Sequence, residues 1–180
     1  MSAKVLLSPA ELQAMLDDPK TVVIDSRAPA AYAAGHIPGA VNVHEIFTYL
    51  ATSTPEGMAE LRQKVVAAFG AAGLGGDATA VIYEGSMNSG FGQSCRGYFL
   101  LSYLGYPKAM VLHGGYHAWE AAGLPITTES AHPTPRAFPL SDAGADMMID
   151  FGMTLERQPD QKGDRVKMTL SGKSLPYKQY

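Results

Sequence analysis

The chain is predicted to fold as an α/β domain with a mainly parallel sheet and helices on both faces. Short apolar runs rich in β-branched residues alternate along the sequence with stretches whose apolar residues recur at helical spacing. Apolar runs without polar alternation are typical of strands that are covered on both sides, as in parallel sheets. Alternating strands and helices favour right-handed crossovers, which place helices on both faces.

The first helix is predicted to begin at Pro9. Ser8 is a suitable N-cap, proline favours the first helical position, and Glu11 can complete a capping box. A proline-containing turn at 17–19 ends the helix. Its inner face is expected to consist of Leu12, Met15 and Leu16.

The first predicted strand covers residues 22–24, and Asp25 and Arg27 follow at its carboxyl end. Open α/β sheets place their sites at that end. A short helix is expected over 29–34, and a turn rich in glycine and proline then leads into a short strand over 40–43.

Thr54 and Pro55 open a longer helix, which a glycine-rich break at 70–76 ends. The residues of this helix that are expected to face the core are Leu61, Val65, Val66 and Phe69. Further along, a buried strand at 109–112 and a helix at 116–122 complete the predicted domain.

The centre of the chain is a strand at 80–83, a loop at 84–92 and a helix at 93–104. The loop is rich in glycine and small polar residues, so its backbone N–H groups and the start of the helix can converge on an anion. The candidate residues of this site are Glu84, Gly85, Ser86, Asn88, Ser89, Gly90 and Arg96.

Composition limits the possible partners and compartments. The net charge of −3 leaves no broad basic surface, so we expect no nucleic acid partner. The N-terminal residues contain neither a signal peptide nor a membrane span, which favours a cytoplasmic protein without a membrane partner. The single cysteine, Cys95, excludes a disulfide within the chain, as suits a reducing compartment.

Residues 22–129 resemble the rhodanese family of sulfurtransferases. Four matching pieces occur in the family's order: Asp25 to Arg27, then Tyr32 with residues 35–42, then residues 112–115, and last Trp119 with residues 123–125. The resemblance implies a five-stranded parallel sheet flanked by helices. It also implies a cysteine directly after the strand at 80–83, which carries a persulfide and moves sulfur from thiosulfate or mercaptopyruvate to an acceptor.

The sequence departs from active members of the family at that position. Glu84 follows the strand, and a carboxylate is neither a sulfur nucleophile nor suited to an anion cradle. The loop outline is similar to that of the non-catalytic N-terminal domain of tandem rhodaneses. The first hypothesis is therefore an accessory, regulatory or binding module of a thiosulfate sulfurtransferase system, which binds a small sulfur-containing anion or docks onto a partner protein or a catalytic rhodanese domain.

Cys95 supports the alternative of an active thiosulfate or 3-mercaptopyruvate sulfurtransferase. It lies near the predicted start of the helix at 93–104 and beside Arg96, and both features lower a thiol pKa. The competing interpretation is a small buried apolar residue. Arg96 either holds a small oxyanion or pairs with Glu84 or Asp25.

The other motif residues are expected to be structural. Asp25 and Arg27 are predicted to form an ion pair that fixes their turn, and His36 to hydrogen-bond to the backbone. Trp119 is expected in the core. His113 and His117 lie four residues apart, but Gly114 and Gly115 break the helical face between them, which argues against a metal site. We expect no metal and no cofactor.

Two domains of unequal order are predicted. Residues 1–129 form the rhodanese-like domain, and residues 130–180 form a proline-containing linker and a loosely structured extension. Within that extension, 146–155 could form an amphipathic helix, and alternating apolar residues at 166–170 could form a lone strand.

Overall fold

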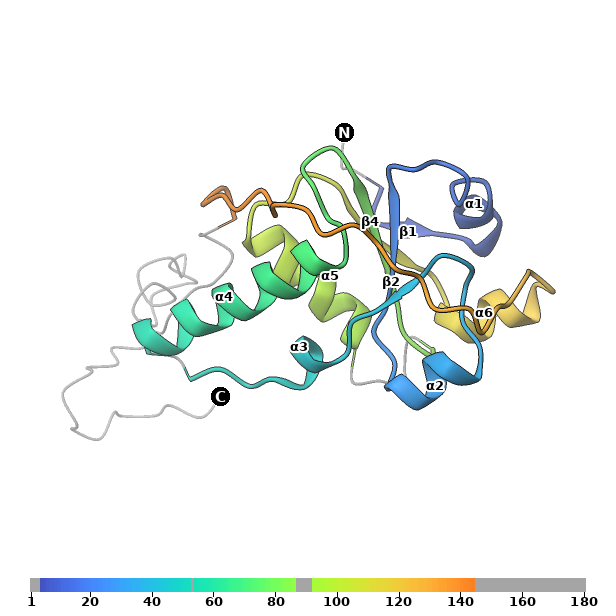
Figure 1. Ribbon diagram of the computed structural model, residues 1–180, viewed down its shortest axis with the longest axis horizontal. Helices are drawn as coiled ribbons and strands as arrows, with labels where there is room; N and C mark the ends of the chain where they lie inside the picture. Colours follow the sequence, from blue (N-terminus) through green and yellow to red (C-terminus); the bar gives the residue numbers. More distant parts are fainter. Residues whose placement is uncertain (1–3, 53, 87–91, 145–180) are drawn as a thin grey trace, which may run out of the picture. The chain divides into compact units, whose positions relative to one another are not determined.

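The computed structural model describes residues 4–52, 54–86 and 92–144. They contain a five-stranded sheet in which all neighbouring strands are parallel, in the order β1-β5-β4-β2-β3 (Figure 1). The strands are β1 (Leu6–Leu7), β2 (Thr21–Asp25), β3 (Val41–Asn42), β4 (Thr79–Tyr83) and β5 (Ala109–Leu112). The α/β class and the parallel sheet that the sequence predicts are confirmed.

The helices cover both faces of this sheet. They are α1 (Pro9–Gln13), α2 (Pro29–Ala34), α3 (Glu45–Thr48), α4 (Pro55–Ala71), α5 (Gln93–Tyr103) and α6 (Gly115–Ala121). Helices α3, α4 and α5 lie on one side, and α1, α2 and α6 lie on the other (Figure 1). The arrangement follows from strands that are apolar on both faces.

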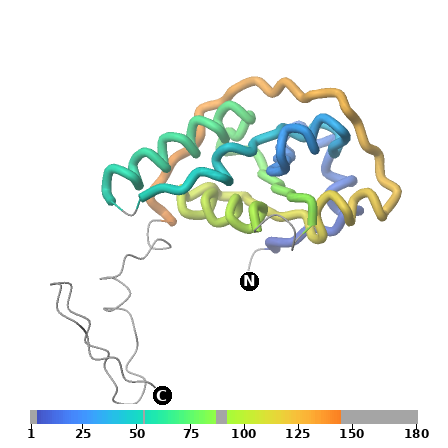
Figure 2. Tube along the Cα trace, turned by 90° about the horizontal axis from the view of Figure 1, so that it is seen from below, coloured from blue at the N-terminus to red at the C-terminus, as the bar shows by residue number. Residues whose placement is uncertain are grey.

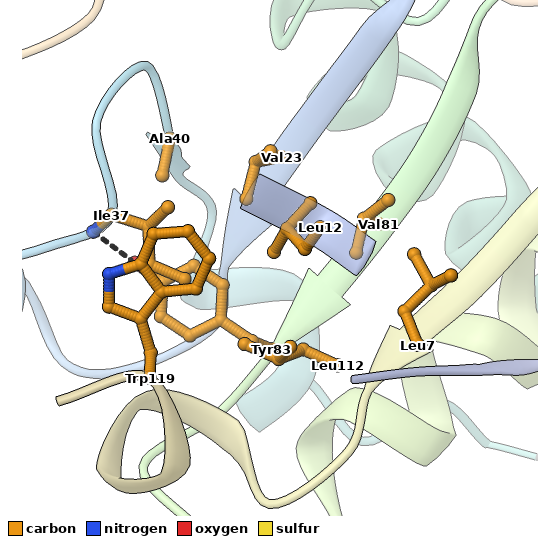
Figure 3. Packing of buried hydrophobic residues seen from close by; sticks show 9 residues of the cluster. All are labelled: Leu7, Leu12, Val23, Ile37, Ala40, Val81, Tyr83, Leu112 and Trp119. Atoms are coloured by element: carbon orange, nitrogen blue, oxygen red, sulfur yellow. Dashed lines mark hydrogen bonds between the residues drawn. The ribbon is translucent and has the colours of Figure 1, made fainter. Parts of the chain in front are cut away.

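The core divides between the two faces of the sheet. On the α1 and α6 side, Trp119 packs beside Ile37 and Tyr83, with Leu12 over Val23 and Val81 (Figure 3). On the other side, α5 approaches β4 so closely that a Cβ on Gly97 would lie 2.6 Å from Ile82 Cδ1. Glycine at this position therefore sets the distance between helix and sheet.

The N-terminal helix has the predicted capping box but is shorter than predicted. Ser8 accepts a hydrogen bond from the Glu11 N–H, and the Glu11 side chain accepts one from the Ser8 N–H. The helix ends at Gln13, and turns replace it up to Asp17. Met15 nevertheless packs against the core from these turns.

Residues 131–144, which we call the C-terminal strap, run back over the domain (Figure 2). The Arg136 N–H donates to the Gly70 carbonyl at 2.9 Å, and the Ser141 N–H donates to the Leu104 carbonyl at 3.0 Å. The Phe138 ring stacks on Phe69 and Tyr106, with centroid separations of 6.1 and 5.2 Å. The helix expected at 146–155 and the strand expected at 166–170 lie outside the described residues.

No helix in the described part of the chain is long and apolar enough to cross a membrane.

Candidate functional site

Glu84 lies directly after β4, and its side chain is buried, with the residue only 1% exposed. Its carboxylate accepts hydrogen bonds from the Ser94 hydroxyl at 2.7 Å and from the Gln93 N–H at 3.2 Å. Helix α5 begins at Gln93, and its N-cap, Gly92, offers no side-chain acceptor. Glu84 therefore caps α5 from across the loop, where the helix dipole favours a negative charge.

The backbone after β4 is held by the start of α6. The Tyr116 N–H donates to the Glu84 carbonyl at 2.8 Å, and the His117 N–H donates to the Gly85 carbonyl at 2.9 Å. Gly115 has a φ of 62°. A Cβ at this position would come within 2.4 Å of the Glu84 carbonyl, so Gly115 permits this close approach.

Two donors at the start of α5 are thus occupied by an internal carboxylate. The Gln93 N–H and the Ser94 hydroxyl, which could bind an anion from solution, bind Glu84 instead. Of the predicted loop site, Gly85 and Ser86 are half-buried beside Glu84. Asn88, Ser89 and Gly90 lie outside the described residues.

Cys95 is the third residue of α5 and is exposed to solvent. The alternative that it is a small buried apolar residue is therefore wrong. Its neighbour Arg96 turns away from the candidate anion site, because the guanidinium donates to the carbonyls of Phe47 and Tyr49. The sequence also allows an ion pair of Arg96 with Glu84 or Asp25. Among the residues that the structure describes, Arg96 forms neither pair.

Asp25 and Arg27 form a fork-shaped ion pair at the end of β2. Arg27 Nη2 lies 2.6 Å from Asp25 Oδ2, and Arg27 Nε donates to Asp25 Oδ1 at 3.0 Å. Burial tends to lower the pKa of Arg27, but the hydrogen bond and charge of Asp25 outweigh it and raise that pKa. The guanidinium also stacks 3.8 Å from the centre of the Tyr116 ring. The pair is enclosed by protein, which suits a structural role.

Tyr83 completes this cluster from β4. Its hydroxyl donates to Asp25 Oδ2 at 2.6 Å and accepts from the Ile37 N–H at 3.3 Å, the bond drawn in Figure 3. Burial, followed by the charge of Asp25, raises the pKa of Tyr83 above its ordinary value. Asp25 is fully buried and accepts hydrogen bonds from Tyr83 of β4 and from Arg27.

His36 and Trp119 bind backbone carbonyls. The His36 ring nitrogens lie 2.8 Å from the Tyr32 carbonyl and 3.0 Å from the Glu129 carbonyl. Trp119 is fully buried, and its Nε1–H donates to the Pro125 carbonyl at 2.8 Å. Both side chains therefore hold the backbone at Pro125 and Glu129 against the interior of the domain. Glu129, which His36 binds, lies just before the C-terminal strap.

Sequence reasoning missed Ser94 and Gln93 as partners of Glu84. The available signal was a serine in the first turn of a helix whose N-cap is glycine, which leaves the first N–H groups without a local acceptor. The roles of Tyr83 and Tyr116 around Arg27 had no comparable local signal.

Comparison with known proteins agrees with this fold. The family model "Rhodanese-like domain" matches residues 8–122. A second model, "Cyanate lyase C-terminal domain", matches residues 143–179. The thiosulfate sulfurtransferase of Azotobacter vinelandii is 34% identical over 183 residues, which cover 95% of this chain and 66% of that protein. The thiosulfate sulfurtransferase of Pseudomonas aeruginosa is 30% identical, covering 76% of this chain and 49% of that protein.

The C-terminal match is shorter and much more similar. A cyanate hydratase of Albidiferax ferrireducens is 72% identical over 32 residues, which cover 18% of this chain and 22% of that protein.

Among solved structures, a 3-mercaptopyruvate sulfotransferase of Escherichia coli aligns with a TM-score of 0.62 at 21% identity, over 78% of this chain and 56% of that one. The chain thus spans only part of the length of the relatives it matches, and by its domain it belongs to the rhodanese family.

Proposed function

We propose that this rhodanese domain has no persulfide relay of its own and is an accessory or regulatory module of a thiosulfate sulfurtransferase system. The observation that supports the proposal is the buried carboxylate of Glu84, which binds Ser94 and Gln93 at the start of α5. A persulfide relay needs a sulfur nucleophile there, with N–H groups free to stabilise its anion. The carboxylate supplies no nucleophile, and its charge opposes the entry of a second anion.

The proposed partner is a catalytic rhodanese domain. The chain covers 66% of the Azotobacter relative and 49% of the Pseudomonas relative, so those sulfurtransferases extend beyond the part that aligns with this chain. The resemblance to the N-terminal domain of tandem rhodaneses supports the same assignment. The partner would then carry out the sulfur transfer, with a small sulfur-containing anion such as thiosulfate as donor.

Cys95 supports a second candidate, an active sulfurtransferase. Its thiol is exposed in the first turn of α5, where the helix dipole favours a thiolate. In that reaction the thiolate would attack the sulfane sulfur of thiosulfate, form a persulfide and release sulfite.

One assay separates the two candidates. The purified full chain and its Cys95→Ser variant are compared for sulfur transfer from thiosulfate to cyanide, and the intact mass is measured after incubation with thiosulfate. The accessory role predicts no turnover by either protein and no added sulfur atom. Turnover that the Cys95→Ser variant loses, together with a persulfide on Cys95, would replace the first candidate by the second.

The cyanate hydratase match supports one more proposed partner. The identity of 72% over 32 residues is about twice the 34% of the Azotobacter match, so this stretch is similar beyond what a shared fold requires. Segments below about 40 residues are seldom stable without a partner, metal or disulfides. We therefore propose that residues 143–179 associate with a cyanate hydratase chain.

Co-purification tests that association. The full chain is co-expressed with a cyanate hydratase, beside a version that ends at residue 142. We expect only the full chain to retain the hydratase. Equal retention by both versions, or by neither, would contradict the proposal.

A further inference from the structure

The ring of His36 has a hydrogen-bond acceptor beside each of its nitrogens. Nδ1 lies 2.8 Å from the Tyr32 carbonyl oxygen, and Nε2 lies 3.0 Å from the Glu129 carbonyl oxygen. A backbone carbonyl can only accept, and a neutral imidazole has an N–H on one nitrogen and a lone pair on the other. Both hydrogen bonds therefore form only when the ring carries two protons, as an imidazolium.

The face of the ring also suits a positive charge. His36 stacks on Tyr32, with the ring centroids 3.7 Å apart and the planes 13° from parallel. The face of an aromatic ring attracts a cation. Tyr32 is held in place, because its hydroxyl donates to the Ala40 carbonyl at 2.8 Å. His36 is fully buried, which disfavours a charge, whereas the two carbonyls and the stack favour it.

Several titratable or charged side chains lie around the ring and the backbone on either side of it. They are Tyr32 of α2, Arg27 with Asp25 at the end of β2, Tyr83 of β4, Tyr116 of α6, and Glu129. Arg27 donates to the Gly35 carbonyl, and Asp25 compensates its charge. In the described part of the chain, His36 forms no ion pair, and Glu129 binds it through the backbone. Carbonyl dipoles rather than a carboxylate therefore stabilise the charged ring.

His36 also holds the segment that leads into the C-terminal strap. Its N–H donates to the Thr127 carbonyl, and the Thr127 N–H donates to the His36 carbonyl, both at 2.9 Å. The ring adds the bond to Glu129. The Ala131 N–H, at the start of the strap, donates to the Tyr32 hydroxyl at 3.3 Å. Residues 127–131, which we call the junction, thus depend on His36 and on the tyrosine that stacks on it.

Loss of one ring proton would weaken this attachment. The proton would leave Nε2 for solvent, since the bond to Glu129 is the longer of the two and is only partly buried. The bare Nε2 would then face a carbonyl oxygen, and two acceptors form no hydrogen bond. We propose that His36 is a pH-dependent latch, which holds the junction on the domain as an imidazolium and releases it when the ring becomes neutral.

Nitrogen NMR of the histidine rings in the full chain tests the protonation state. A ring with two protons shows both nitrogens as N–H, whereas a neutral ring shows one N–H and one bare nitrogen. At about pH 7.5, above the ordinary range of histidine, we expect His36 to show two protonated nitrogens. His44 is the internal control, because its Nδ1 binds a single carbonyl, that of Ser26, and a neutral ring can supply that bond. One bare nitrogen on His36 at this pH would overturn the proposal.

Amide exchange tests whether the ring proton holds the junction. Protection at Thr127 and Ala131, corrected for the intrinsic exchange rate at each pH, should fall about tenfold as His36 loses its proton. The Val43 N–H, which donates to the Asp25 carbonyl and lies next to His44 in the chain, should keep its protection. Protection at the junction that does not follow the titration of His36 would overturn the latch.

Matched variants assign the effect to His36. Glutamine is neutral at every pH and carries its donors on one nitrogen. We expect His36→Gln to lower the protection of the junction about tenfold at about pH 6 and to remove its pH dependence. His44→Gln should leave both as in wild type. Equal effects in the two variants, or wild-type protection in His36→Gln, would overturn the proposal. If His36→Gln does not fold, the ring and amide titrations of the wild-type chain decide.

Discussion

The Glu84 carboxylate accepts a hydrogen bond from the Ser94 hydroxyl at 2.7 Å, across the loop that joins β4 to α5. Both residues are only 1% exposed, so the charge and its partner are removed from water together. The same carboxylate accepts from the Gln93 N–H. The start of α5 therefore carries its own anion, at the position where a rhodanese relay would hold a sulfur anion.

Replacing Ser94 by alanine should destabilise the domain. The change removes one donor from a buried carboxylate, and we expect a loss of about 1 to 3 kcal/mol in the free energy of unfolding. Urea denaturation measures it. Ser102→Ala, in the same helix and half-buried, is the control and should change stability by less than about 0.5 kcal/mol. Similar losses in both variants would contradict a special role for the Glu84 to Ser94 bond.

Glu84→Gln should make the start of α5 more accessible to anions. The variant keeps the shape of the side chain and removes a like charge, which at about 4 Å opposes an anion by at least about 1 kcal/mol. We expect thiosulfate to bind about fivefold more tightly, as measured by calorimetry. Glu45→Gln, in the first turn of α3, is the control. Unchanged affinity in Glu84→Gln would contradict the view that the Glu84 charge excludes anions.

Local signals in the sequence predict much of the fold. Helix α2 matches its expected range, and the expected N-caps at Ser8 and Thr54 both accept hydrogen bonds from their helices. Cap chemistry and apolar runs are properties of neighbouring residues, so a single sequence contains them. Strand β1 has only two residues and α3 only four, and neither had been expected, because elements this short have no measurable periodicity.

The partners within the candidate site were harder to predict. The departure at Glu84 is visible in the sequence, but its partner Ser94 lies ten positions further along, and no sequence pattern links the two residues. Arg96 donates to carbonyls nearly fifty residues away, at Phe47 and Tyr49. Backbone carbonyls are the same for every residue type, so no sequence pattern marks them as the acceptors of a guanidinium.

Arg27→Gln should be strongly destabilising. Asp25 is fully buried and pairs with Arg27, so removal of the guanidinium leaves a buried carboxylate without its cation. Breaking such a pair costs about 3 to 5 kcal/mol. The exposed pair of Arg62 with Asp142 is the comparison, and Arg62→Gln should cost at most about 1 kcal/mol. Chemical denaturation at neutral pH measures both, and equal costs would contradict the structural role of the Asp25 to Arg27 pair.

Tyr106 should make the stability of the domain depend on alkaline pH. Its hydroxyl donates to the carbonyls of Gly75 and Ala78, and burial raises its pKa from 10.0 to about 12. Because the folded pKa is above the unfolded one, the stabilising effect is present below pH 10 and is lost as the pH rises to about 12. Tyr106→Phe should remove this part of the pH dependence. The free energy of unfolding of both proteins between pH 8 and 12 measures it, and parallel curves would contradict the prediction.

Phe138→Ala should release the C-terminal strap. The ring stacks on Phe69 of α4 and on Tyr106, and no other aromatic residue of the described strap packs on the domain in this way. Loss of a half-buried phenylalanine should cost about 2 kcal/mol, below the range for fully buried aromatic residues. The Arg136 and Ser141 N–H groups, which bind carbonyls at Gly70 and Leu104, should then exchange with solvent faster than in wild type.

Leu140→Ala is the control for this variant, since Leu140 lies in the strap but is 49% exposed. It should change neither the free energy of unfolding nor the exchange of the Arg136 and Ser141 amides. Exchange at Arg136 that is equally slow in Phe138→Ala and in wild type would contradict the view that the Phe138 ring anchors the strap, because a released strap exposes its amides to solvent.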